Sequence, residues 1–399
     1  MHMSKPKPPV LALMGVAALS LGIRLVHLVA TRDSPFVRHP VGDAARYLEW
    51  AQSIANGQWF SDQPFYQAPL YPYVLGLYFH FVDDSAAAVR ALQAVWGAVA
   101  CVLIAMAAGR WFGRRAGILS GVLLAIYPPA VFFDSIVQKA SLDGPLVCAL
   151  LAVWPVRGTI GLARAGLVGL LAGWLCLTRE NALVWLLLLF LGLAVRRKGG
   201  GQSQVLASTC APGSAERDHR TAARRSDAIV PYGGTWRRSR AAAGAAFVIA
   251  VMAALSPVVW HNYRVGGEWV VTTSQAGSNF YIGNHRGADG RYVPLVPGHE
   301  TPAFEREDAT RLAEADVGRP LTAREVSWYW FARAWSDIRS DPIAWARLMG
   351  LKLLMTWNRY EVSDAESLAH QTALSPVLAL VTPVWHFGVL ALLAAMGRR

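Results

Sequence analysis

The sequence predicts an all-α, polytopic integral membrane protein. Apolar residues make up 54% of its 399 positions, charged residues only 16%, and the mean hydropathy is +0.31. Long apolar runs recur along the chain, and short polar or basic segments separate them. Soluble domains carry about 25% charged residues. The lower charge and the repeated apolar runs therefore indicate a chain built mainly of membrane-spanning helices.

Eight apolar runs are predicted to cross the membrane. They cover residues 10–30, 91–108, 116–133, 142–156, 162–177, 182–195, 241–260 and 375–396. Several are shorter than the roughly 20 residues that cross a bilayer unaided. We therefore expect flanking semi-polar turns to complete these spans.

Basic residues predict the orientation of the spans. They cluster before the first span, between spans two and three, four and five, and six and seven, and at the end of the chain: Lys5, Lys7, Arg110, Arg114, Arg115, Arg157, Arg164, Arg196, Arg197, Lys198, Arg398 and Arg399. Cytoplasmic loops carry an excess of such residues. The formal net charge of +12 then results largely from the basic residues of the cytoplasmic loops, which set the orientation of the spans. No nucleic-acid-binding module is recognisable, so no nucleic-acid partner is expected.

The apolar stretch 68–81 is not counted as a span. It has only about 14 residues, and Pro69 and Pro72 interrupt its start. That length fits an interfacial or re-entrant helix. Counting it as a span would also place the arginine clusters of every later loop outside.

The predicted organisation has five parts. Residues 1–195 form a membrane module of six spans with a first outer loop at 31–85, and residues 196–240 form a basic, disordered cytoplasmic linker. Span seven follows at 241–261, then a second outer region at 262–374, then a last span and cytoplasmic end at 375–399. The linker is Gly/Ser-rich and has no apolar period, which is typical of disorder.

The first outer loop contains an acidic residue at the start of an amphipathic helix. Asp43 opens DAARYLEWAQSIANG, in which Tyr47, Leu48, Ala51, Ile54 and Ala55 share one face and Gly57 ends the helix. One interpretation makes Asp43 an N-cap that accepts hydrogen bonds from the first turn. The alternative gives the carboxylate a chemical role, because carboxylates at a bilayer face are usually functional.

The order of several motifs resembles that of the GT-C glycosyltransferases. The motifs are Gly42-Asp43-x-x-x-Tyr47, then Pro69-Leu70-Tyr71-Pro72, Val89-Arg90-Ala91-Leu92, Arg110-Trp111-Phe112-Gly113-Arg114-Arg115, Ser141-Leu142-Asp143-Gly144-Pro145, Asn279-Phe280-Tyr281-Ile282-Gly283-Asn284 and Trp357-Asn358-Arg359-Tyr360-Glu361. Within that class the chain resembles the family 39 protein O-mannosyltransferases, the lipid A aminoarabinose transferase and the lipopolysaccharide-core transferases of the Rgt type. The resemblance implies a GT-C-like helix bundle with juxtamembrane helices on the outer face.

The resemblance also implies an activity. Such enzymes transfer a sugar from a polyprenyl-phosphate carrier to a protein, lipid or glycan acceptor at the outer face of the plasma (inner) membrane. The essential acidic residue of the family's first outer loop matches Asp43, which is the candidate general base. An acceptor hydroxyl that attacks an anomeric carbon needs such a base, and the phosphate leaving group needs a cation.

Four basic residues near outer span ends are candidates for that cation: Arg24, Lys139, Arg179 and Arg264. Each could instead anchor its helix by reaching the lipid headgroups. Tyr47, Gln138, Asp143 and Glu180 complete the predicted donor and substrate set. Asp143 matches an acidic position of the family's second outer turn. No cluster has metal-ligand spacing, and the sequence leaves a divalent metal open.

The second outer region is aromatic and polar. Residues 321–339 and 342–359 are predicted to form amphipathic helices that carry Trp328, Trp330, Trp335, Trp345 and Trp357. Interfacial anchoring is the default role for such tryptophans, and contact with a sugar or a polyprenyl tail is the alternative.

Two other classes of function remain open from the sequence. A secondary transporter would show internal repeats and charged or broken helices near the bilayer midplane, and neither is visible. A catalytically silent GT-C-like scaffold is the second alternative. The sugar, the acceptor and the oligomeric state are not predicted.

Overall fold

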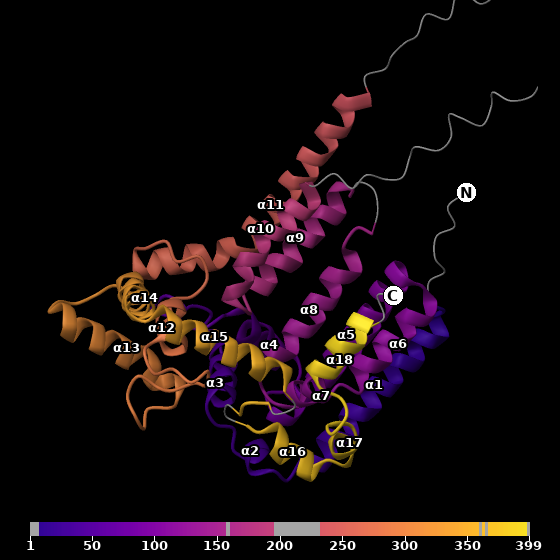
Figure 1. Ribbon diagram of the computed structural model, residues 1–399, viewed down its shortest axis with the longest axis horizontal. Helices are drawn as coiled ribbons and strands as arrows, with labels where there is room; N and C mark the ends of the chain where they lie inside the picture. The colour runs from indigo at the N-terminus through magenta and orange to yellow at the C-terminus, as the bar shows by residue number, and fades with distance from the viewer. Residues whose placement is uncertain (1–7, 157–159, 195–231, 359–360, 364–365, 397–399) are drawn as a thin grey trace, which may run out of the picture.

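The computed structural model describes residues 8–156, 160–194, 232–358, 361–363 and 366–396, and all regular elements among them are helices (Figure 1). Within these described ranges, three helices are long and apolar enough to cross a membrane: Val10–Thr31, Ala86–Phe112 and Arg240–Gly266. A fourth candidate is the pair Arg114–Ala125 and Pro128–Ser135, bent by 53°. The all-helical, polytopic membrane class predicted from the sequence is confirmed.

The first group of helices packs around α5 (Ala86–Phe112). It comprises α1 (Val10–Thr31), α6 (Arg114–Ala125), α7 (Pro128–Ser135) and α8 (Ala140–Val153). Small residues bring these helices close together, as is common where packing replaces the hydrophobic effect in lipid. A methyl group added at Gly121 of α6, for example, would overlap Val16 of α1.

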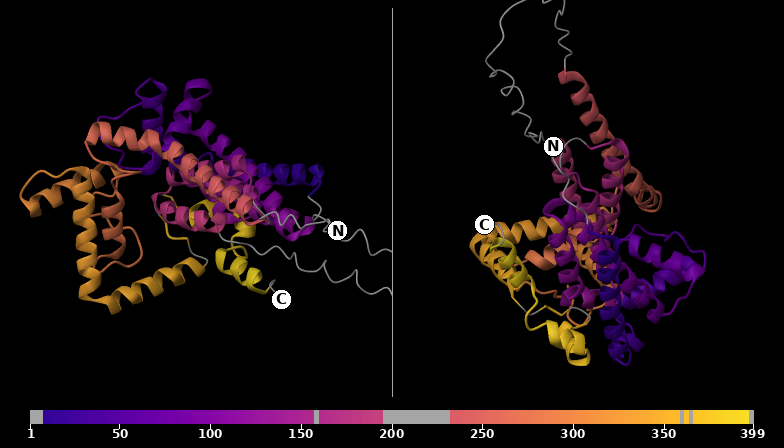
Figure 2. Two further views of the ribbon diagram at one scale, coloured as in Figure 1. Left: turned by 90° about the horizontal axis from the view of Figure 1, so that it is seen from above. Right: turned by 90° about the vertical axis from the view of Figure 1, so that its right-hand side faces the viewer.

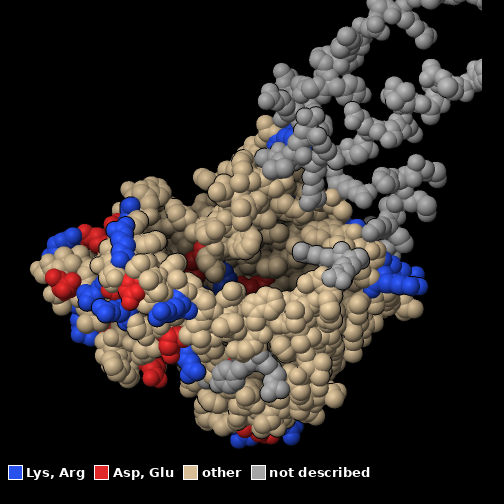
Figure 3. Space-filling view, viewed as in Figure 1, with Lys and Arg blue, Asp and Glu red and all other residues tan. Residues whose placement is uncertain are grey.

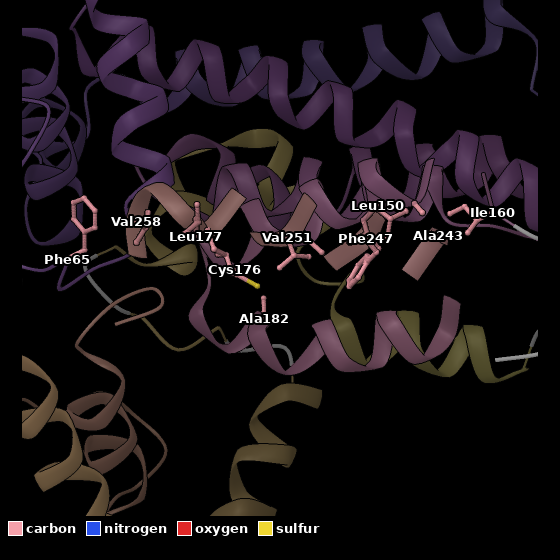
Figure 4. Packing of buried hydrophobic residues seen from close by; sticks show 14 residues of the cluster. Phe65, Leu150, Ile160, Cys176, Leu177, Ala182, Ala243, Phe247, Val251 and Val258 are labelled. Carbon is pink, nitrogen blue, oxygen red and sulfur yellow. The ribbon is translucent and has the colours of Figure 1, made fainter. Parts of the chain in front are cut away.

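The second group pairs α9 (Leu162–Cys176) with α11 (Tyr232–Gly266), and α10 (Leu183–Ala194) follows the short helix η1 (Glu180–Ala182). Gly169 and Gly173 of α9 lie against the backbone of α11 and Ala254. The buried side chains of this cluster run in a row from Phe65 at one end to Ile160 at the other (Figure 4). This core fixes the Thr178–Asn181 turn at one end of the two helices.

Residues 31–85, predicted as the first outer loop, fold into helices too short to span a membrane. It contains α2 (Pro35–Arg38), α3 (Asp43–Ala55) and α4 (Leu70–Phe81). The predicted apolar face of α3 is confirmed, because Tyr47, Ala51 and Ile54 are buried. They pack against α4, where a methyl group added at Gly76 would overlap Ile54.

Residues 262–374, predicted as the second outer region, begin as a helical lobe at one end of the molecule, orange in Figures 1 and 2, and then lead back toward the rest of the chain. It contains α12 (Ala276–Asn284), α13 (Pro302–Val317), α14 (Ala323–Ser340) and α15 (Pro342–Trp357). The last two match the predicted amphipathic helices, whereas α12 and α13 were not predicted. Trp330 is buried, and its indole donates to the Ala309 carbonyl at 3.0 Å, so this tryptophan holds the lobe together.

Two predicted boundaries are wrong. The span predicted at 375–396 is not one helix but α17 (Pro376–Val381) and α18 (Phe387–Met396). Pro383 lies between them, and a proline cannot donate the backbone hydrogen bond that would continue α17. Helix α11 begins at Tyr232, inside the segment predicted as a linker. The rest of that linker, 196–231, lies outside the described residues.

The segment before α17 returns to the first group of helices through α16 (Leu368–Leu374). Gln371 of α16 is fully buried. Its Oε1 lies 2.8 Å from His27 Nε2 and accepts a 2.9 Å hydrogen bond from Ser135 Oγ, while its Nε2 donates to Glu366 at 2.7 Å. The side-chain amide of Gln371 therefore connects α16 to α1 and α7 by hydrogen bonds.

Candidate functional site

Asp43 is the first residue of α3, but it does not cap the helix. The N-cap is Gly42, with φ of 60° and ψ of −132°, a conformation that favours glycine. No side-chain capping bond is formed there. The Asp43 carboxylate instead accepts a hydrogen bond at each oxygen, from Gln67 Nε2 at 2.9 Å and from Gln138 Nε2 at 3.1 Å. The N-cap interpretation of Asp43 is therefore wrong.

The carboxylate of Asp43 borders two cavities. The larger, of 730 Å³, is also lined by Gln67, Gln275 and Asn279 and by residues between Gly290 and Glu305. The smaller, of 50 Å³, is lined largely by apolar side chains, among them Phe132. An ionised carboxylate can accept about four hydrogen bonds. Two are used, so Asp43 retains acceptor capacity toward these spaces.

Gln93 of α5 forms hydrogen bonds with the backbone of the turn that precedes Gln138. The Gln93 side chain is fully buried, and its Nε2 donates to the backbone carbonyls of Asp134 at 3.1 Å and Ile136 at 2.8 Å. Its Oε1 accepts from Tyr71 Oη at 2.5 Å. These bonds join α4, α5 and the turn. The orientation of Gln138 toward Asp43 is therefore built into the fold.

Lys139 follows Gln138 at the start of α8. Its backbone N–H donates to Gln138 Oε1 at 3.0 Å, and its side chain is partly buried. Among the described residues, its ammonium group has neither a hydrogen-bond partner nor an ion-pair partner. A partly buried cation without a counter-ion is a suitable ligand for an anionic group.

Asp143 and Arg179 form an ion pair across α8 and the turn after α9. Arg179 Nε lies 2.5 Å from Asp143 Oδ2, and the arginine side chain is 45% exposed. The other carboxylate oxygen of Asp143 is buried and has no partner among the described residues. The pair keeps a guanidinium group fixed, with half of its surface accessible.

Tyr47 is buried in the core between α3 and α4. Its ring packs edge-on against Tyr71 at 5.1 Å, and it has no exposed surface. Burial raises the pKa of the phenol well above its usual value, and the nearby charge of Asp43 adds to the effect. Glu180 and Arg179 also act electrostatically on this hydroxyl. Tyr47 is therefore a buried support in the neighbourhood of these charges, with no surface for substrate.

Glu180 supports the wall of the larger cavity. Its Oε1 accepts hydrogen bonds from Thr273 Oγ1 at 3.0 Å and from Gln275 Nε2 at 2.7 Å. Gln275 itself lines the cavity beside Asp43. Glu180 is thus tied to the loop before α12, and it does not pair with Arg179.

The remaining two predicted cations lie in other surroundings. Arg24 is buried in the first group of helices, where Nε and Nη2 each lie 2.7 Å from Asp134 Oδ2. Arg264 is exposed, and its guanidinium group lies 5.3 Å from the centre of the Trp260 ring. Neither residue lines the two cavities that Asp43 borders. Of the predicted set, only Asp43 and Gln138 line these cavities. Lys139 follows Gln138 along the chain, Arg179 pairs with Asp143, and Glu180 bonds to the cavity residue Gln275.

Sequence reasoning missed three contributors to this site. Gln67 donates a hydrogen bond to Asp43. Gln275 donates a hydrogen bond to Glu180. Glu366 lines the smaller cavity from the late segment, and burial raises its pKa. Only Gln67 carried a sequence signal, because it immediately precedes the Ala-Pro-Leu-Tyr-Pro motif.

The face in Figure 3 is hollowed near its middle, and acidic and basic side chains lie at the floor of the hollow. Within the described part of the chain, no group of three or more His, Cys, Asp or Glu residues comes together to hold a metal ion. The site is instead built from one carboxylate with two amides, a lysine and an arginine–aspartate pair.

The fold and these groups define an all-helical, polytopic membrane protein with a polar, charged site among its helices. Residues 62–205 match the family model described as dolichyl-phosphate-mannose-protein mannosyltransferase. The match covers a little over one third of the chain, and Asp43 precedes it. It confirms the GT-C and protein O-mannosyltransferase resemblance over these residues, and it supports a membrane glycosyltransferase of the GT-C type. No curated protein and no solved structure matched the chain.

Proposed function

We propose that the protein transfers a sugar from a polyprenyl-phosphate-linked donor to an acceptor hydroxyl, with Asp43 as general base. One observation carries the proposal: the Asp43 carboxylate is oriented by two amides at the border of a 730 Å³ cavity. Lys139, the neighbour of Gln138 along the chain, offers an unpaired ammonium group among the described residues. A base and a phosphate-binding cation are the two groups that this reaction needs.

The reaction proceeds by a single displacement. The acceptor oxygen forms a bond to the anomeric carbon while the bond from that carbon to the phosphate oxygen breaks. The electron pair leaves with the polyprenyl phosphate, and the hydroxyl proton passes to Asp43. Configuration at the anomeric carbon inverts. The phosphate leaves as a stable anion, so no general acid is required.

Lys139 and Arg179 hold the departing phosphate in this proposal. The charge of the phosphate ester increases as the bond breaks, and a preorganised cation stabilises that change. Arg179 contributes less than Lys139, because its guanidinium group already pairs with Asp143 at 2.5 Å. The larger cavity receives the acceptor, since Asp43 must reach the attacking hydroxyl.

Replacement of Lys139 tests the donor site. In Lys139→Ala, retention of polyprenyl phosphate should weaken by about 10- to 100-fold, the usual loss when a charged hydrogen bond is removed. Arg179→Ala should show a smaller loss. Native mass spectrometry of the detergent-purified protein measures the retained lipid phosphate. Arg264→Ala is the matched control, and equal retention by Lys139→Ala and Arg264→Ala would contradict the assignment.

The proposal places the site at the outer face of the plasma (inner) membrane. A cysteine introduced at exposed Asp62, with Cys210 replaced by serine, should react with an impermeant maleimide in intact cells. The wild-type Cys210, predicted to be cytoplasmic, should react only after permeabilisation, while Cys101, Cys148 and Cys176 are buried. Protection of the residue at position 62 together with labelling of Cys210 would reverse the topology.

A further inference from the structure

Two cavities beside the first outer loop meet at Arg306 of α13. One has a volume of 560 Å³ and the other 230 Å³. Both are lined by Gln63, Tyr66 and Arg306, so these residues form the boundary between them. Neither cavity is lined by Asp43. This double cavity is therefore separate from the carboxylate of the proposed transfer site.

Arg306 is partly buried and lacks a counter-ion at contact distance. Among the described residues, its guanidinium group makes no hydrogen bond and no ion pair. Burial lowers the pKa of Arg306; the charges of Tyr66 and Asp62 oppose this shift, whereas that of Arg46 adds to it. Asp62 therefore lies near Arg306 but outside ion-pair distance. A bound anion would offset the cost of burying this permanent cation.

The rest of the larger cavity suits a saccharide. Trp50 and Phe60 supply aromatic surface, and Gln58, Gln63, Ser53 and Ser61 supply amide and hydroxyl groups. The C–H faces of a sugar ring can pack on aromatic rings, while its hydroxyls need such polar partners. Arg46 and Arg306 provide the positive groups of the wall, and Glu49 and Asp62 the negative ones. An arginine fork binds carboxylate and phosphate oxygens in a bidentate manner.

Gln67 connects this cavity to the transfer site. It lines both the 560 Å³ cavity and the 730 Å³ cavity. The same side chain donates to Asp43 at 2.9 Å. Helix α13, which carries Arg306, also contacts α3, which carries Asp43. A ligand in the double cavity would therefore lie on the other side of one glutamine from the proposed base.

We propose that the double cavity binds an acidic sugar unit of the acceptor, with Arg306 as the ligand of its carboxylate or phosphate group. This inference rests on the proposed transfer reaction and adds the acceptor's charge to it. Arg46 is the second cation at the cavity, and Trp50 and Phe60 pack against the ring. The neutral part of the acceptor extends past Gln67 toward Asp43.

Saturation-transfer difference NMR on the purified full-length protein tests the site with two probes, methyl glucuronoside and the neutral methyl glucoside. The glucuronoside should bind the wild-type protein at least about tenfold more tightly than the glucoside, because only its carboxylate can pair with Arg306. Arg306→Gln should remove this preference. Arg324→Gln, a change at an exposed arginine outside both cavities, should keep it.

The variant Asp43→Asn separates this inference from the proposed reaction, because it should keep glucuronoside binding while losing transfer. Equal binding of the two probes, or an undiminished preference in folded Arg306→Gln, would overturn the acidic-sugar site without touching the role of Asp43. Displacement of the glucuronoside by phosphatidylglycerol nanodiscs, but not by phosphatidylcholine nanodiscs, would also overturn it, since the anion would then be a lipid headgroup.

Discussion

Asp43→Asn should reduce sugar transfer by about 10²- to 10⁴-fold, the usual contribution of a positioned general base. Asparagine has nearly the same shape and keeps one oxygen that can accept from Gln67, although it loses the acceptor for Gln138, so the local packing should survive. It cannot take up the acceptor proton. The measurement is transfer of a labelled sugar from a polyprenyl-phosphate carrier to acceptors in membranes that contain the variant.

Asp33→Asn is the matched control for this change. Asp33 is an exposed carboxylate of the same segment, residues 31–85, and pairs with Arg38 at 2.5 Å. Its replacement should leave transfer close to that of the wild type. Preserved transfer in an Asp43→Asn protein that still folds would show that the carboxylate is not the general base. This outcome would not depend on the results for the Lys139 and Arg179 variants.

Asp134→Ala should destabilise the protein by about 3–5 kcal/mol, the typical cost of breaking a buried ion pair. Arg24 is only 2% exposed, and Asp134 Oδ2 is its sole carboxylate partner among the described residues. The surroundings leave little room to relax, since a methyl group at Gly97 would overlap both side chains. Thermal unfolding in detergent should show a large fall in the midpoint temperature.

Arg24→Met gives the informative comparison. A buried carboxyl group that loses its cation can bind a proton and become neutral, whereas a guanidinium group stays charged. Arg24→Met should therefore cost less than Asp134→Ala. The double variant Arg24→Met/Asp134→Leu should recover most of the stability. Equal losses in the two single variants, without recovery in the double variant, would show that shape rather than charge dominates at this pair.

The sequence predicts the local parts of this site better than their partners. The 3.6-residue period of α3 correctly identifies the buried face that contains Tyr47. The motif order predicts a chemical role for Asp43, and this role stays a prediction. The amides that hold Asp43 come from positions 24 and 95 residues further along the chain. No periodicity relates such positions, because their proximity depends on how α4, α5 and the turn between α7 and α8 pack.

Charged residues near span ends are the clearest example of this limit. Arg24 and Lys139 are equivalent candidates in the sequence, since both are cations near an outer span end. In the structure, Asp134 neutralises Arg24, whereas Lys139 has no such partner in the described part of the chain. Hydropathy also predicts the span at 375–396 from its composition alone. It does not register that Pro383 interrupts the backbone bonding there.

The hydrogen bond between Gln371 and His27 can form only after both residues have been synthesised. The two residues are separated by 344 positions, and at about 5–20 residues per second the ribosome needs roughly 17–70 s to connect them. The first helices and Asp43 would already be in the membrane during this interval, while Glu366 would still be missing from the wall beside the carboxylate. The nascent chain should therefore acquire its complete site only after residue 371 has been made, when all the earlier helices have been inserted.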